Sequence, residues 1–319
     1  MNRRVLLAVD GSEKSLEATS ILGQLLKDRS NLDILLFHCV QQLGMLYPGE
    51  LTEVEISQQL SLDAQTKVGD AVLASSSRAL AESGFPEDRI QLKLGLGCTD
   101  PAQEIMTEAD SERIRTIALG RRGRAPLGNF LLGSVSSKVA QYARYRTVWI
   151  IDAPVNQTRK VLVALAGAPD SRALTYYTAE FLAPIPQMHY TFFHIMPPIP
   201  PTFWDDGHIL GSEEQKDRKS RIEEWRSDWT QKVEKFMDEA CHSVVEQGVS
   251  PQNVEKRILK TKEGIARDLL NEIARGEYHV VVMGKKSFYE RKPFLMGSHA
   301  NKVLQNIQKA ILCLVDATQ

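Results

Sequence analysis

The sequence predicts two tandem α/β domains, each built on a doubly wound parallel sheet, and three observations support this prediction. Three sequence blocks recur in the same order in the two halves of the chain, strand and helix patterns alternate within each half, and the expected strands are short and almost entirely apolar. The paired blocks are 5–18 with 161–174, 35–40 with 191–196, and 117–123 with 281–287. Such ordered repetition indicates a duplicated domain rather than chance similarity.

Apolar runs rich in Val, Ile and Leu predict the strands of the first half, because strands covered by helices on both faces lose the alternation of exposed sheets. These strands are expected at 4–9, 33–40, 90–95, 115–119 and 147–151. Helical patterns between them predict helices at 13–28, 61–83, 101–110 and 134–145. Ser12 or Gly11 begins the first helix, and Asp100 followed by Pro101 is typical of a capped start for the third.

The second half repeats this alternation. Its strands are expected at 160–165, 189–195, 254–260, 279–283 and 311–315, with a long helix rich in Glu and Lys at 213–247. The proline-rich segment 196–201 is too stiff for a helix or a sheet interior and is expected to be a loop. The repeat places the junction near 153–159, so we expect one domain at 1–154 and the other at 159–319.

The composition is that of a soluble globular protein, with 319 residues, 43% hydrophobic, 25% charged and a net charge of −1. This charge gives no support for nucleic acid or a membrane as a partner, and no apolar stretch approaches the ~20 residues of a membrane helix. The scattered cysteines show no metal-ligand spacing and are expected to be reduced thiols. The first apolar run is too short for a signal peptide, so the cytoplasm is the expected location.

After the fourth predicted strand, the spacing G-x2-G-x9-G-S places Gly120, Gly123, Gly133 and Ser134 ahead of a helix. Glycines let the backbone approach a ligand closely, and a helix start offers unpaired N–H groups and a positive dipole end to an anion. Open α/β sheets bind ligands at the carboxyl ends of their strands, so this loop predicts a phosphate site. Asp10 ends the first strand at the same crevice, where a carboxylate suits a ribose hydroxyl or a metal on the phosphates.

This glycine spacing, the VDGS run after the first strand and the FHCV run ending the second together resemble the nucleotide-binding branch of the universal stress protein family, in tandem form over nearly the whole chain. The resemblance implies a Rossmann-like sheet of the adenine nucleotide alpha-hydrolase type, and ATP, ADP or AMP as the ligand, with Mg²⁺ on the phosphates. The residues that it assigns to the nucleotide are Asp10 near the ribose and phosphates, the Val40 backbone on the adenine, Leu119 and Gly120 beside the nucleoside, and Gly123, Gly133, Ser134 and Val135 around the phosphates. From charge alone we also place Arg121, Arg122 and Arg124 near the phosphates.

The second half departs from this pattern. It keeps Gly284, Gly297 and Ser298, but Ser287 replaces the second glycine and Ala166 replaces the aspartate. A Cβ restricts the backbone, and losing the carboxylate removes a ribose or metal contact. We therefore expect nucleotide binding chiefly in the first domain, and a degenerate site in the second that still suits an anion because its loop is basic.

Simpler interpretations of the same residues stay open. The two Gly-Ser pairs are also common helix starts, and Asp10 also suits a cap for the helix beginning near Ser12. His38 and His194 occupy equivalent strand ends and are expected to be packed structural residues rather than catalysts.

The expected function is nucleotide-dependent sensing or signalling in a stress response, in which occupancy changes a surface that an unidentified protein partner binds. No motif supplies a nucleophile, a general base or a metal-ligand set, so we expect no catalytic residues and at most slow ATP hydrolysis. The alternatives are a slow ATPase or phosphotransferase, and a binder of an apolar or acyl ligand beside Phe203 and Trp204. The resemblance also implies that the last strands, 147–151 and 311–315, pair within the chain as a pseudo-dimer, while a homodimer stays open.

Overall fold

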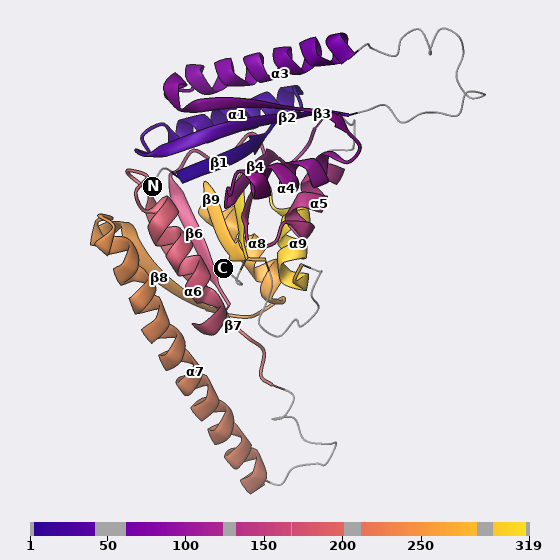
Figure 1. Cartoon of the computed structure of the whole chain (residues 1–319). Coiled ribbons are helices and arrows are strands. Elements are labelled where there is room, and N and C mark those ends of the chain that lie inside the picture. The colour runs from indigo at the N-terminus through magenta and orange to yellow at the C-terminus, as the bar shows by residue number, and fades with distance from the viewer. Residues whose placement is uncertain are drawn as a thin grey trace, which may run out of the picture.

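The computed structural model of the chain describes residues 3–41, 62–123, 132–166, 168–200, 212–285 and 296–316. These residues form two successive α/β units, which we call the first lobe (3–151) and the second lobe (160–315). Figure 1 shows the first lobe in indigo to magenta and the second in pink to yellow.

The first lobe alternates strands and helices as the sequence predicts. Its main elements are β1 (Arg3–Ala8), α1 (Glu13–Leu26), β2 (Leu32–Gln41), α3 (Leu62–Glu82), β3 (Ile90–Cys98), α4 (Pro101–Ser111), β4 (Thr116–Gly120), α5 (Ser134–Tyr142) and β5 (Thr147–Ile151). Helix starts follow the expected chemistry, because Ser12 accepts a hydrogen bond from the Ser15 amide and Asp100 accepts one from the Ala102 amide. Helix α5 is shorter than predicted, because the backbone of Ala143 is already extended.

The second lobe repeats the same order. It contains β6 (Lys160–Leu165), α6 (Ala168–Tyr177), β7 (His189–Met196), α7 (Ser212–Glu246), β8 (Val254–Lys260), α8 (Ile265–Gly276), β9 (Val280–Gly284), α9 (Ser298–Asn306) and β10 (Ile311–Val315). The long predicted helix is therefore confirmed as α7, and Figure 1 shows it extending well beyond the sheet. No helix in the described ranges has the length and apolar content needed to cross a membrane.

The described strands form one continuous ten-stranded sheet in the order β3-β2-β1-β4-β5-β10-β9-β6-β7-β8. The strands of each lobe pair in parallel, whereas β5 and β10 pair antiparallel at the centre, with Trp149 opposite Cys313. The predicted pairing of the last strands within one chain is thus confirmed. It relates the two lobes by an approximate two-fold axis, as in a symmetric dimer.

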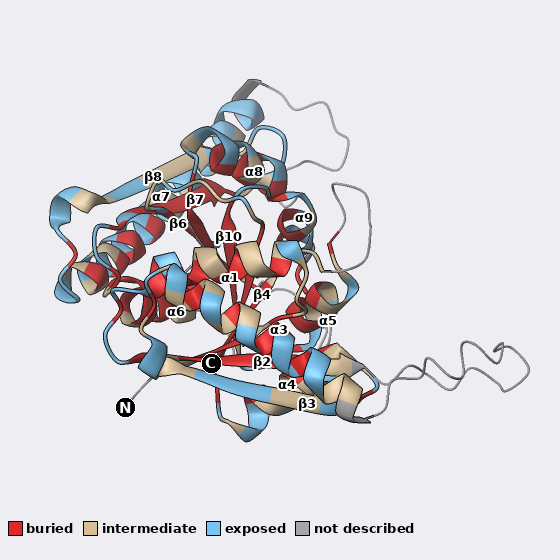
Figure 2. Cartoon of the chain, turned by 90° about the horizontal axis from the view of Figure 1, so that it is seen from above, coloured by how far each residue is buried: buried red, intermediate tan, exposed pale blue. Residues whose placement is uncertain are grey.

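Helices cover both faces of this sheet, as a doubly wound fold requires. Buried side chains of α1, α3, α6 and α7 form one apolar core with one face, and those of α4, α5, α8 and α9 form another with the opposite face. Figure 2 shows buried strands in red at the centre and exposed helix surfaces in pale blue outside. Because both cores cross the lobe boundary, the two lobes share their hydrophobic stabilisation.

The expectation of reduced thiols is wrong for two of the cysteines. Cys39 in β2 and Cys98 in β3 form a disulfide, with Cα atoms 6.1 Å apart. They meet because β2 and β3 are adjacent parallel strands, a pairing that scattered sequence positions do not reveal. Cys241 and Cys313 are free, and Cys313 is fully buried as a small apolar residue of the core.

His279, directly before β9, predicts a loss of stability in mild acid. Its side chain is buried, and neither ring nitrogen has a hydrogen-bond partner among the described residues. Burial, with a smaller contribution from Arg159, lowers the pKa of His279 from 6.5 to about 4. The unfolded chain therefore takes up this proton first, so stability is lost as the pH falls from about 6.5 towards 4.

We expect the free energy of unfolding to fall by about 2 kcal/mol between pH 7 and pH 5 on account of this one group. Denaturant unfolding at both pH values should show a smaller fall in His279→Leu than in the wild type. The exposed His189 provides a control, since His189→Asn should keep the wild-type difference. Equal pH dependence in His279→Leu and the wild type would contradict the assignment.

Candidate functional site

The candidate site of the first lobe lies at the carboxyl ends of β1 and β4, where the strand order changes direction. Strand β1 pairs with β2 on one side and with β4 on the other, and Ala8 lies opposite Leu119 in the second pairing. The segments that follow these two strands, at Asp10 and at Gly120, therefore leave the sheet next to each other. Such switch points open a crevice for ligands in doubly wound sheets.

Asp10 and Gly123 lie against each other at this switch point. The Asp10 Oδ1 atom accepts hydrogen bonds from the Ser12 amide at 3.0 Å and from the Ser12 hydroxyl at 2.7 Å. A Cβ added to Gly123 would overlap the other carboxylate oxygen, Oδ2, well inside van der Waals distance. The absence of a side chain at Gly123 thus lets the glycine loop approach the carboxylate. The capping interpretation of Asp10 is partly right, since it stabilises the turn at Gly11 (φ 77°), but the helix cap itself is Ser12.

Backbone hydrogen bonds hold the two ends of the glycine loop together. The Gly133 amide donates to the Arg121 carbonyl at 2.9 Å, and the Arg121 amide donates to the Ile151 carbonyl at 2.8 Å. The Ser136 hydroxyl in α5 donates to the Gly120 carbonyl at 2.7 Å. The start of α5 is therefore fixed directly beside the end of β4.

The start of α5 suits an anion. Its N-cap is Gly133, which provides no side-chain hydrogen bond to the first-turn amides, and Ser134 is exposed. Uncapped amides and the helix dipole together favour negative charge at this position. The position of Gly133 as the N-cap agrees with both the helix-start interpretation and the anion-site prediction.

The remaining predicted residues of the first lobe are Val40, Leu119 and Val135. Between Cys39 and Gln41 the register of β2 with β3 shifts, which leaves Val40 without a paired residue in β3. Such an irregularity releases backbone groups from the strand ladder. Leu119 is buried in the core, and the partly buried Val135 packs against the same core.

Arg121 does not point towards the predicted phosphate site, which corrects the expectation drawn from its charge. Its side chain is 3% exposed and donates to the carbonyls of Leu304 at 2.9 Å and Gln305 at 2.6 Å, in the last turn of α9. Asp152 lies 3.8 Å from its Nε atom and 3.7 Å from Nη2 of Arg122. The terminal carbonyls of a helix carry partial negative charge, and the lobe pairing brings them next to Arg121. Arg124 lies outside the described residues.

The two strand-end histidines are structural, as predicted. Nδ1 of His38 lies 2.7 Å from the Val9 carbonyl, and Nδ1 of His194 lies 2.8 Å from the Leu165 carbonyl. Both rings are buried, and burial lowers the pKa of His194. Each ring thus joins the ends of two neighbouring strands.

The second lobe keeps the same backbone arrangement without the carboxylate. The Gly297 amide donates to the Lys285 carbonyl at 3.0 Å, and the Lys285 amide donates to the Val315 carbonyl at 2.8 Å. Gly284 ends β9. Ser298 begins α9, and its N-cap, Gly297, provides no side-chain hydrogen bond. Ala166 lies exposed where the first lobe has Asp10. Ser287, Phe203 and Trp204 lie outside the described residues.

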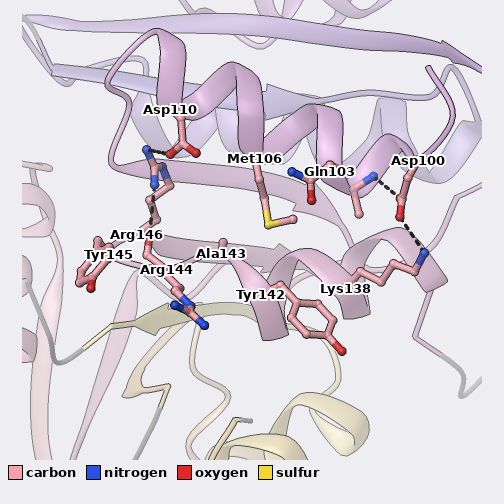
Figure 3. A pocket seen from close by; sticks show the side chains of 11 residues that line it. Asp100, Gln103, Met106, Asp110, Lys138, Tyr142, Ala143, Arg144, Tyr145 and Arg146 are labelled. Carbon is pink, nitrogen blue, oxygen red and sulfur yellow. Dashed lines mark hydrogen bonds and ion pairs between the residues drawn. The ribbon is translucent and has the colours of Figure 1, made fainter. Parts of the chain in front are cut away.

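A separate pocket of about 560 Å³ lies between α4 and α5. Figure 3 shows that two ion pairs, Lys138 with Asp100 and Arg146 with Asp110, cross between its walls, with Met106 and Tyr142 between them. None of the predicted nucleotide residues lines this pocket. It is therefore distinct from the crevice at the strand ends.

Fold and site together define a tandem doubly wound α/β protein with a glycine-containing loop at the switch point of its first lobe. The sequence pattern of the Universal stress protein family matches residues 1–151 and again residues 157–314, so the chain belongs to this family. The predicted membership of this family, in tandem form, is thereby confirmed.

Individual relatives agree with this assignment. The chain is similar to universal stress protein YxiE of Bacillus subtilis (strain 168), with 28% identity over 149 residues that cover 44% of this chain and 93% of the relative. It is also similar in structure to a universal stress protein from Archaeoglobus fulgidus DSM 4304, with a TM-score of 0.63, 19% identity and 99% coverage of both chains. A protein of unknown function from Pseudomonas aeruginosa PAO1 gives a TM-score of 0.54, 15% identity, and coverage of 98% of this chain and 92% of that one. At these identities the two structural likenesses show the tandem fold alone.

Proposed function

We propose that this chain binds an adenine nucleotide, ATP or else ADP or AMP, in the crevice of its first lobe, and acts as a nucleotide-dependent sensor in a stress response. The observation that carries the proposal is the contact between Asp10 and Gly123 beside the uncapped start of α5. A carboxylate next to an anion site is otherwise unfavourable, and a ribose hydroxyl or a cation on the phosphates resolves this conflict.

The residues of the crevice fit such a ligand. The amides of Gly123, Ser134 and Val135 would donate to the phosphates, because glycine loops and helix starts suit a phosphate chain. Asp10 would hold the ribose or a Mg²⁺ ion, and the Val40 backbone would bind the adenine. Mg²⁺ would supply charge neutralisation of the phosphates, while the protein supplies position.

Nucleotide occupancy would act on the start of α5, and so on a surface that a partner protein binds in the cytoplasm. A ligand shifts such an equilibrium only by binding one loop arrangement more tightly than another. Sensing therefore requires that the conformation or stability at the start of α5 differs between the free and the occupied protein. Hydrogen exchange of residues 132–142 can test this difference.

Titration calorimetry with ATP and Mg²⁺ tests the proposal directly. We expect saturation near one nucleotide per chain, because the second lobe keeps the loop scaffold but lacks the carboxylate at Ala166. Asp10→Ala should weaken binding about tenfold or more, since it removes a charged hydrogen-bond acceptor. Binding of two nucleotides would refute the silent second lobe, and the absence of any binding would refute the proposed function.

A further inference from the structure

Two cations cross the boundary between the lobes in opposite directions. Arg121, in the glycine loop of the first lobe, donates to the last-turn carbonyls of α9 in the second lobe. Lys285, at the equivalent position of the second lobe, donates through Nζ to the carbonyl of Ala143, directly after α5 in the first lobe, at 2.5 Å. The arrangement is therefore reciprocal. The residue after β4 contacts the end of α9, and the residue after β9 contacts the end of α5.

A second reciprocal pair accompanies the first. Asp152, after β5, accepts a hydrogen bond from the Lys309 amide at 3.1 Å, and Asp316, after β10, accepts one from the Tyr145 amide at 3.0 Å. Lys309 and Tyr145 hold equivalent positions and both have left-handed backbones, with φ of 54° and 56°. The two-fold relation thus extends from the strands to the polar contacts around both helix ends.

The burial of these two cations has a cost in desolvation free energy. Lys285 is 1% exposed and Arg121 is 3% exposed. Removing a cation from water is unfavourable even when it is hydrogen-bonded, and an apolar side chain of similar size often packs at least as stably. An apolar residue at either position would avoid this cost but would leave the helix-end carbonyls without these donors, so the charges serve to hold the two helix ends.

The helices that these two cations contact indicate what the charges do. Helix α5 begins at the anion-binding end of the first crevice, and α9 begins at the corresponding end of the second. A cation at the carboxyl end of a helix is favoured by the dipole and fixes the terminal carbonyls. Each short helix thus has one end at a crevice and the other end held by the opposite lobe.

We infer that Lys285 is a positioning residue for the nucleotide crevice of the first lobe, which it sets from the second lobe through α5, and that Arg121 ties the same crevice to α9. The inference rests on the proposed function and adds its regulation. The second lobe, whose own site is degenerate, sets the affinity of the first lobe for nucleotide. Any change in the second glycine loop reaches the first crevice through Lys285, and nucleotide in the first crevice reaches α9 through Arg121.

The test compares Lys285→Met, Lys285→Arg and a matched control, Arg29→Met. Arg29 is also a buried cation that donates to a main-chain carbonyl of the other lobe, Glu180 at 3.0 Å, but Glu180 lies in the turn that continues α6, which does not begin at the first crevice. Two measurements are made on each full-length protein: the Kd for ATP with Mg²⁺, and amide hydrogen exchange across 134–143. Circular dichroism checks that each variant is folded.

We expect Lys285→Met to weaken ATP binding about fivefold, within the usual range of couplings between sites, and to speed exchange in α5. Lys285→Arg should restore both values, because arginine performs the equivalent contact at position 121. Arg29→Met should lower the melting temperature and leave both values unchanged. Wild-type affinity and wild-type α5 exchange in a folded Lys285→Met protein would overturn the inference, as would equal effects of Arg29→Met. Failure of the wild type to bind ATP would overturn the proposed function, and α5 exchange would still decide the coupling.

Discussion

Gly123→Ala is expected to abolish nucleotide binding in the first crevice, with an affinity at least about a hundredfold below that of the wild type. The new Cβ would overlap Oδ2 of Asp10, and this carboxylate cannot rotate freely because Oδ1 is bonded to the amide and hydroxyl of Ser12. Either Asp10 leaves its position or the glycine loop moves away from it. In both cases the carboxylate and the loop amides no longer face one ligand. Calorimetry with ATP and Mg²⁺ measures the loss.

A double-mutant cycle with Asp10→Ala provides the control. If the alanine methyl acts by displacing Asp10, then Gly123→Ala should cost only a few-fold more affinity once the carboxylate is gone, because neighbouring substitutions that share a mechanism are not additive. The melting temperature should change little, since Gly123 itself is partly exposed. A full additional loss in the Asp10→Ala background, or wild-type binding by Gly123→Ala, would refute the steric explanation.

The layout of the first crevice was largely predictable from the sequence because it depends on local signals. Asp10 and Gly120 each follow an apolar strand, and parallel strands bring such ends to the same edge of the sheet. The repeat supplied the rest, since it fixes which elements of the two halves correspond and makes the last strand of each half a candidate for pairing. Helix α5 also begins where Gly133 and Ser134 indicated.

Other features depend on where the lobes meet, which no local pattern encodes. Arg121 carries the charge expected of a phosphate ligand, yet it points away from the crevice because the last turn of α9 lies next to it. The signal that was missed is comparative: Arg121 and Lys285 are both basic at equivalent positions, although the glycine and aspartate of the motif have changed between the halves. A charge retained while the ligand residues around it diverge indicates a structural partner. The disulfide of Cys39 and Cys98 escaped for a similar reason, since it needs the register of two strands.

The lobe boundary also predicts the largest effect on stability, that of Trp149→Ala. Trp149 in β5 is completely buried, and its indole Nε1 donates to the hydroxyl of Tyr177 in the second lobe at 2.8 Å. Its ring contacts Phe181 edge-on, with 5.5 Å between the ring centroids. Phe181 in turn stacks on Tyr177, with 5.2 Å between the centroids. Truncation would leave a cavity between the lobes and remove a hydrogen bond from a buried hydroxyl. We expect a loss of about 3–5 kcal/mol in the free energy of unfolding, as for other buried tryptophans.

The neighbouring Tyr176 gives a matched control, because it lies one residue from Tyr177 on α6 but is 65% exposed. Tyr176→Ala should change stability by less than about 0.5 kcal/mol. Guanidinium unfolding followed by circular dichroism separates the two cases. Since one sheet runs through β5 and β10, Trp149→Ala should shift a single transition of the whole chain rather than split it. Two resolved transitions, with only the first lobe destabilised, would show that the lobes fold independently and that the contacts of Arg121 and Lys285 join two autonomous units.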